Sequence, residues 1–224
     1  MATLESDDAN IVEATAVNWR LVVYPLVATI VLVLGGFGYY YCLQNQRDLR
    51  EAQAHDAAFQ AKTPEAFIQI ADQFPDTNQG VLALLSAANL SFDKKDYASA
   101  LKNYQRVISH PEANALQRDA AQLGVASTFE ATDKADDAIN AYLTVAHRGK
   151  DTPYSPYAYA AITKIYEQRG DKENQRKILL QLTSLNVDSP FVKEAQQSLK
   201  ELSPEPALAP TTASPSPAPA APQP

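Results

Sequence analysis

A pattern of small and large apolar residues recurs along the chain at a nearly constant period. In the stretch FDKKDYASALKNYQRVI (92–108), the pattern is carried by Ala100, Tyr104 and Val107. Spacings of three and four residues place such side chains on one face of an α-helix. Equivalent positions follow 38 and then 37 residues later, as Ala138, Tyr142 and Val145 and then as Gln175, Leu179 and Leu182. The chain therefore repeats one structural unit.

Each unit is expected to contain two amphipathic helices. A small residue lies at the same distance before each pattern, as Ala88, Ala126 and Thr163, and polar breaks (DKKD, TDKA and RGDK) separate the two halves. Small residues let paired helices approach closely. A helix pair of this size cannot bury its apolar face alone, so a period of this length implies stacking. The pattern predicts an all-α solenoid of antiparallel helix pairs.

Helix-terminus signals support this layout. Thr63-Pro64, Ser155-Pro156 and Ser189-Pro190 each place a capping residue before a proline, which favours a helix start. Gly149 and Gly170 are expected at helix ends. The final apolar stretch, SPFVKEAQQSLKEL, is expected to close the array as a capping helix.

A second feature is the uncharged run LVVYPLVATIVLVLGGFGYYYCL, residues 21–43. As a helix it would extend about 35 Å, enough to cross the hydrocarbon core of a bilayer. Trp19 and Tyr24 at one end and three tyrosines at the other match interfacial aromatic belts. A cleaved signal peptide is the main alternative, but the preceding residues are acidic and no small-residue cleavage site follows. An uncleaved anchor is the favoured interpretation.

Composition divides the chain into four parts. We expect residues 1–20 to form a short acidic leader, 21–43 the membrane helix, 44–202 the repeat domain and 203–224 a disordered Pro/Ala-rich tail. The net charge of −7 is divided as −3 in the leader, −3 in the repeat domain and −1 in the tail. No part is basic enough for a nucleic-acid footprint. The single cysteine, Cys42, excludes an intramolecular disulfide.

Catalytic and cofactor-binding groupings are not evident. No two glycines of the repeat domain are close enough to form a phosphate-binding loop. His55, His110 and His147 are far apart in sequence and lack metal-ligand spacing. The acidic residues Asp133, Asp136 and Asp137 mark a turn and a helix start rather than a metal site. We expect a non-enzymatic protein without metal or cofactor.

The repeat resembles the tetratricopeptide repeat family. DYASALKNYQRVISHPE is similar to the second helix of that repeat, and the resemblance covers residues 78–185 as three units. AFIQIADQFPDT (66–77) also resembles a second helix, so a degenerate unit is expected to begin near Gln44. Gln175 replaces the usual alanine, which implies looser packing in the third unit.

The resemblance also implies a concave groove, lined by the first helices of successive units, that binds peptides or partner helices. Phe92 and Tyr157 are the expected aromatic anchors, although either could instead pack between units. The residues that would line this groove are Leu85, Asn89, Phe92, Leu123, Ser127, Glu130, Tyr157, Ala161, Lys164 and Glu167.

The order of leader, membrane helix and repeat array resembles the bacterial inner-membrane proteins that serve as ancillary subunits of the Sec translocon. In that family the repeats face the periplasm and associate with the translocon and with periplasmic chaperones. The resemblance thus implies a single-pass inner-membrane protein with extracytoplasmic repeats, although Arg47, Arg50 and Lys62 give a slight charge bias towards cytoplasmic repeats. The favoured function is a membrane-anchored adaptor. The alternative is a structural assembly factor of the envelope, for division or outer-membrane assembly, that uses the Pro-rich tail.

Overall fold

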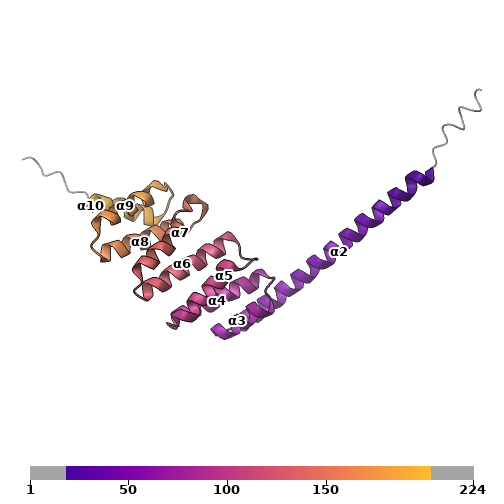
Figure 1. Cartoon of the computed structure of the whole chain (residues 1–224), viewed down its shortest axis with the longest axis horizontal. Helices are drawn as coiled ribbons and strands as arrows, with labels where there is room; N and C mark the ends of the chain where they lie inside the picture. The colour runs from indigo at the N-terminus through magenta and orange to yellow at the C-terminus, as the bar shows by residue number, and fades with distance from the viewer. Residues whose placement is uncertain (1–18, 203–224) are drawn as a thin grey trace, which may run out of the picture.

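The computed structural model describes residues 19–202, and within that range every regular element is a helix (Figure 1). The predicted all-α fold is confirmed. The leader up to residue 18 and the Pro-rich tail lie outside the described residues. The elements are α2 (Trp19–Gln60), α3 (Pro64–Gln73), α4 (Asn78–Asp93), α5 (Tyr97–Ser109), α6 (Ala115–Ala131), α7 (Ala135–Ala146), the 3-10 helix η1 (Gly149–Asp151), α8 (Ser155–Gln168), α9 (Lys172–Ser184) and α10 (Pro190–Leu202).

Helices α3 to α10 stack as antiparallel neighbours, while most of α2 projects away from them (Figure 1). The three predicted units are the pairs α4–α5, α6–α7 and α8–α9. The first helices also contact one another across units, α4 with α6 and α8 with α10. This arrangement is the predicted solenoid of helix pairs.

The turns inside the three pairs have the same backbone geometry. At equivalent positions Lys95, Asp133 and Gly170 adopt φ values of 63°, 58° and 68°. In each turn the next amide donates a hydrogen bond of 2.9 Å to a carbonyl five residues earlier: Asp96 to Ser91, Lys134 to Phe129 and Asp171 to Tyr166. This pattern is the Schellman motif, which ends a helix and reverses the chain. Only the third pair places a glycine there.

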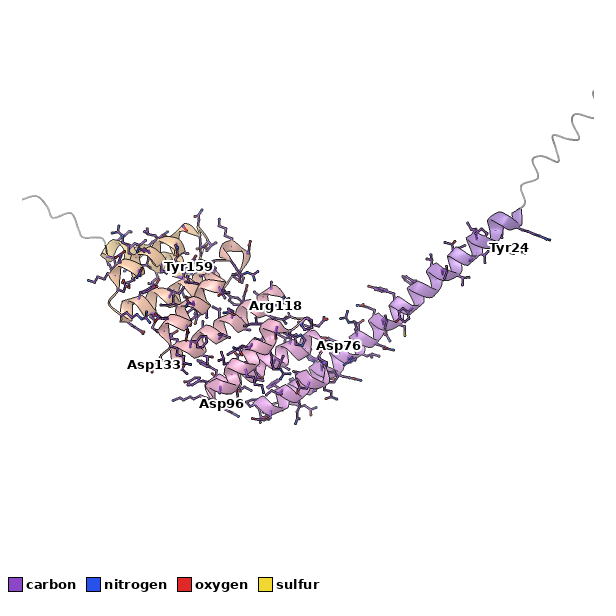
Figure 2. All side chains as sticks on the ribbon, in the orientation of Figure 1. Tyr24, Asp76, Asp96, Arg118, Asp133 and Tyr159 are labelled. Carbon is purple, nitrogen blue, oxygen red and sulfur yellow. The ribbon has the colours of Figure 1, made fainter. Side chains whose placement is uncertain are left out.

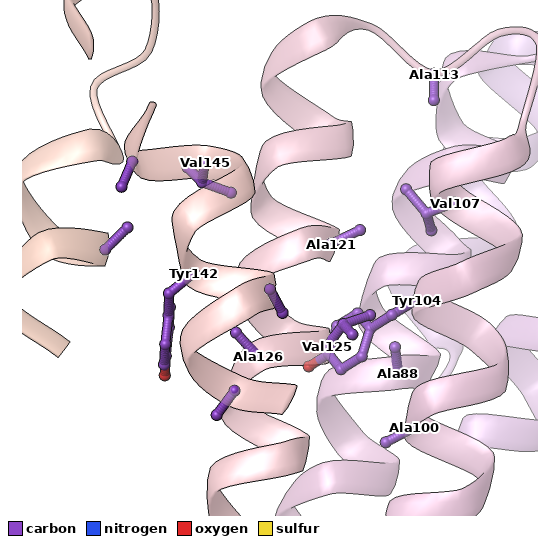
Figure 3. Close-up of a cluster of buried hydrophobic side chains, with 14 of the residues drawn as sticks. Ala88, Ala100, Tyr104, Val107, Ala113, Ala121, Val125, Ala126, Tyr142 and Val145 are labelled. Atoms are coloured by element: carbon purple, nitrogen blue, oxygen red, sulfur yellow. The ribbon is translucent and has the colours of Figure 1, made fainter. Parts of the chain in front are cut away.

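The repeated apolar positions form the core. Figure 3 shows Tyr104 close to Ala88 and Val125, so that residues of neighbouring helices meet around one ring. Close packing of this kind accounts for the combination of small and large side chains in the first two units. All nine pattern residues are buried: Ala100, Tyr104, Val107, Ala138, Tyr142, Val145, Gln175, Leu179 and Leu182.

Two of the three Ser/Thr-Pro signals mark helix starts as predicted. Thr63 caps α3 by accepting the Ala66 amide, and Ser189 directly precedes α10. The expectation for Ser155 is wrong, because Tyr154 occupies the cap position of α8. The Ser155 hydroxyl is fully buried and donates instead to the Ala146 carbonyl at 2.6 Å. This bond ties α8 back to the end of α7.

The last helix, α10, is in register with α8. Ser155-Pro156 and Ser189-Pro190 are 34 residues apart, and α10 packs against both α9 and α8. It buries Val192 and Ala195, while its outward side is polar. Helix α10 therefore has the place of one further first helix and also closes the array, as predicted.

Helix α2 is continuous for 42 residues, about 63 Å at the rise of an α-helix. It includes a stretch long and apolar enough to cross a membrane. Its described side chains from Val23 to Leu49 are all exposed, and burial begins at Arg50. In Figure 2, Tyr24 lies at the end of α2 far from the repeats. No break separates the apolar stretch from the repeat domain at residues 43–44.

The end of α2 is fastened to the array by polar contacts. The Glu51 carboxylate accepts the Asn78 and Gln79 amides at 3.0 and 2.9 Å, at the start of α4. An anion is favoured at a helix N-terminus because the amides there lack partners and the helix dipole is positive. Arg50 contacts Asp76 at 2.6 Å, and Ala54 is fully buried. The end of α2 and α3 thus pack at the start of the array, and the degenerate unit expected to begin near Gln44 stays a prediction.

Candidate functional site

The ten predicted groove residues lie on α4, α6 and α8, and all of them are at least partly exposed. The structure divides them into two sets. Leu85, Asn89, Phe92, Leu123 and Ser127 lie on α4 and α6, which we call the front of the groove. The other set lines one pocket, together with residues of α9 and α10; it consists of Glu130, Tyr157, Ala161, Lys164 and Glu167.

Buried tyrosines hydrogen-bond to polar residues at the front of the groove and to Glu130 at the edge of the pocket. The Tyr104 hydroxyl donates to the Asn89 side-chain oxygen at 2.7 Å. The Tyr142 hydroxyl donates to the Glu130 carboxylate at 2.9 Å and lies 3.1 Å from the Ser127 hydroxyl. Each ring rises from a second helix and ends at a polar residue of the preceding first helix. Asn89, Ser127 and Glu130 therefore already have hydrogen-bond partners inside the chain.

Burial changes the acidity of both tyrosines. It raises the pKa of Tyr104 to about 12, and the negative charge of Asp93 acts in the same direction. Burial is also the main cause that raises the pKa of Tyr142, and the neighbouring Glu130 carboxylate adds to it. The low-dielectric surroundings disfavour the phenolate in each case. Both hydroxyls therefore remain donors at neutral pH.

The rear pocket lies among α6, α8, α9 and α10 and has a volume of about 420 Å³. Its floor includes Leu179 and Leu182, and Gln175 also reaches it. Leu179 stands where the two preceding units have a tyrosine. A shorter side chain without a hydroxyl neither fills this space nor reaches the groove. The pocket agrees with the looser packing expected from Gln175.

Both predicted aromatic anchors pack against another ring of this chain. Phe92 contacts Tyr97 edge-on, with ring centroids 5.6 Å apart. Tyr157 contacts Phe191 of α10 edge-on at 5.8 Å and is still 42% exposed. Phe92 therefore packs within its own unit, whereas Tyr157 forms part of the pocket wall.

Sequence reasoning missed the α9 and α10 side of this pocket. The 34-residue offset between the two Ser-Pro pairs places Phe191 at the position of Tyr157 and Ser198 at that of Lys164. That offset identifies α10 as a first helix that faces the groove. The missed pocket residues on these helices are Gln175, Leu179, Leu182, Phe191, Glu194, Ala195 and Ser198.

The described residues contain no group of three or more His, Cys, Asp or Glu side chains that could hold a metal ion. His110 and His147 end α5 and α7, and His55 lies on an exposed part of α2. Asp136 and Asp137 occupy the first turn of α7, next to the turn residue Asp133.

Comparison with known proteins agrees with this geometry. A family model described as a tetratricopeptide repeat-like domain matches residues 16–149, which include α2 to α7. Among curated proteins, no sequence matches the chain. The family match spans more than half of the 224 residues. The chain therefore belongs to the tetratricopeptide repeat-like domain family.

Proposed function

We propose that this protein is a membrane-anchored adaptor that binds a partner protein in the groove formed by its first helices. The observation that carries the proposal is the open rear pocket, where five predicted groove residues meet residues of α9 and α10. Repeat domains of this family are typically non-catalytic interaction modules, and their first helices offer an extended binding surface.

The anchoring role rests on α2. Its apolar stretch has the length of a membrane span, and its described side chains there are exposed to the surroundings rather than packed in the domain. The same helix continues into the contacts of Arg50 and Glu51 with the repeats. Cleavage as a signal peptide would cut a continuous helix, so this continuity favours an uncleaved anchor.

Within this role we propose that the protein lies in a bacterial inner membrane and that its repeats are extracytoplasmic. There it would be ancillary to protein translocation or to envelope chaperones. The support is the order of acidic leader, membrane helix and repeat array. A topology reporter fused after Leu202 tests the orientation. Reporter activity confined to the cytoplasm would contradict the translocation role but would leave the adaptor role standing.

Photo-crosslinking in native membranes tests the adaptor role itself. A photoreactive amino acid is placed in the full-length chain at Lys164 in the rear pocket or at Asn89 at the front of the groove. The matched control position is Arg176, which is exposed on α9 and does not line the pocket. We expect one protein to recur in adducts from both groove positions and to be absent from the control. The same adducts at all three positions, or none at the groove, would refute the adaptor role.

Removal of residues 203–224 separates the adaptor from the envelope-assembly alternative. Partner adducts that persist without the tail support binding by the groove. Loss of those adducts, with Tyr157→Ala and Phe92→Ala having no effect, supports assembly through the Pro-rich tail.

A further inference from the structure

The rear pocket differs chemically from the rest of the groove. Lys164 stands at the position of Asn89 and Ser127, and Leu179 replaces the tyrosine that would bond to it. The pocket is also outside the family match, apart from Glu130, because that match ends at residue 149. The lining residues other than Glu130 thus lie outside the matched region.

Three carboxylates from three different helices line the pocket: Glu130 of α6, Glu167 of α8 and Glu194 of α10. Glu130 accepts the Tyr142 hydroxyl. Glu167 and Glu194 are exposed and form no ion pair within residues 19–202. Lys164 is the single basic residue of the lining, so the pocket has a surplus of two negative charges.

The floor and one wall of the pocket are apolar. Leu179, Leu182 and Ala195 are buried beneath it, and the edge-on pair of Tyr157 and Phe191 forms a wall. A suitable occupant therefore needs an aliphatic stem, to cover the floor, and a cationic head, to meet the carboxylates. Arginine has both, and its planar guanidinium can also stack on an aromatic ring and pair with two carboxylates.

The side chains at the front of the groove indicate which residues would flank such an arginine in a bound segment. Leu85, Phe92 and Leu123 are partly exposed apolar residues on α4 and α6. A segment that continues from the pocket along the groove would pass over these side chains. Apolar residues next to the arginine would cover this surface, whereas acidic ones would be repelled from the pocket.

We infer that the rear pocket binds an arginine side chain carried by an otherwise apolar segment of a partner protein. The inference rests on the proposed adaptor function and names the chemistry of its partner. Charge complementarity and the shape of the pocket select this occupant.

Fluorescence anisotropy with the full-length protein in phosphatidylcholine nanodiscs tests the inference, with empty nanodiscs as the blank. The probe is a fluorescein-labelled twelve-residue peptide of alanine and leucine with one central arginine. The same peptide with citrulline in place of arginine keeps the shape and removes the charge. We expect the arginine peptide to bind about tenfold more tightly or better, since hydrogen bonds between charged groups are the strong ones. Equal binding of the two peptides, or no binding by either, would overturn the inference.

Two sets of variants localise the binding. Glu167→Gln with Glu194→Gln should reduce the affinity for the arginine peptide to that for the citrulline peptide. The matched control, Asp48→Asn with Asp137→Asn, removes two exposed carboxylates from α2 and α7 and should leave the affinity unchanged. An equal loss in both double variants would mean nonspecific attraction and would contradict the inference.

Leu179→Tyr restores the tyrosine of the preceding units and should fill the pocket. We expect binding of the arginine peptide to be lost, while the helical circular dichroism and its thermal transition are retained. Full affinity in this variant would contradict the inference. In the crosslinking experiment, a partner captured at Lys164 through a segment without arginine would overturn the inference and leave the adaptor role intact.

Discussion

The front of the groove and the rear pocket are built from equivalent positions of the same repeat, yet one is closed and the other is open. In the α4–α5 and α6–α7 pairs, Tyr104 and Tyr142 fill the space between helices and bond to Asn89, Ser127 and Glu130. In the α8–α9 pair, Leu179 leaves a pocket of about 420 Å³. The residue at one repeat position, tyrosine or leucine, therefore distinguishes the filled units from the unit that leaves a pocket.

The largest effect on the free energy of unfolding is expected when the tyrosine that fills the α6–α7 pair is truncated. Tyr142 is 1% exposed, and Tyr142→Ala removes its ring and leaves Ser127 and Glu130 without this partner. We expect a loss of about 3–5 kcal/mol in the free energy of unfolding, as for other large-to-small core changes. Leu179→Ala should cost about 2 kcal/mol, because that site already borders open space. Guanidinium unfolding of the full chain in detergent, followed by circular dichroism, measures both, and equal losses would contradict the comparison.

Gly124 tests how tightly a tyrosine fills the closed part. A Cβ atom at this position on α6 would lie 2.3 Å from ring atoms of Tyr104. Gly124→Ala should therefore destabilise the fold by about 1–3 kcal/mol through overpacking, partly offset by the better helix propensity of alanine. The double variant combines Gly124→Ala with Tyr104→Leu, which copies the leucine of the α8–α9 pair. We expect its loss in the free energy of unfolding to be smaller than the sum of the losses in the two single variants. Strict additivity in the same unfolding assay would show that the ring is not the obstacle.

The buried hydroxyl of Tyr104 predicts a dependence on alkaline pH. Its pKa is raised to about 12 in the folded protein and is near 10 when unfolded, so the unfolded state releases its proton first. The stabilisation is complete below about pH 10 and should be lost as the pH rises towards about 12. Thermal unfolding across this range should show a smaller decrease in Tm for Tyr104→Phe than for the unchanged protein. An identical pH dependence in both proteins would contradict this assignment.

The smallest effect concerns the turns inside the pairs. Lys95 has φ of 63°, a left-handed conformation that glycine adopts without the steric cost of a Cβ, as at Gly170 in the α8–α9 pair. Lys95→Gly should therefore raise the stability by about 0.5–1 kcal/mol. Lys94→Gly, at a residue with φ of −78°, is the control and should not stabilise. A rise in Tm for both variants, or for neither, would contradict the explanation.

The sequence predicted the parts of the structure that depend on local periodicity. The spacing of Ala100, Tyr104 and Val107, which recurs at successive intervals of 38 and 37 residues, indicated the helix pairs and their buried faces. The reason is that three- and four-residue spacings define a helix face, and a single pair cannot bury that face without neighbours. The Ser189-Pro190 start of α10 followed from capping preferences in the same way.

Other features were decided by contacts between distant segments. Ser155 reads as a helix cap in the sequence, but the nearby Ala146 carbonyl binds its hydroxyl in the buried interior. The contact of α2 with the repeats includes Glu51 at the α4 N-terminus, 27 residues further along the chain. Neither contact has a local sequence signal.

The groove shows most clearly the difference between features set by local sequence and features set by contacts between distant segments. The sequence by itself determined an all-α repeat array, a membrane-length apolar helix and the helix faces on which groove residues would lie. Only the tertiary structure decided that Tyr104 and Tyr142 bond to some of those residues, that others line the pocket above Leu179, and that Glu130 does both. The physical reason is that helix periodicity is set by near neighbours, whereas a pocket depends on the sizes and partners of side chains that meet from four separate helices.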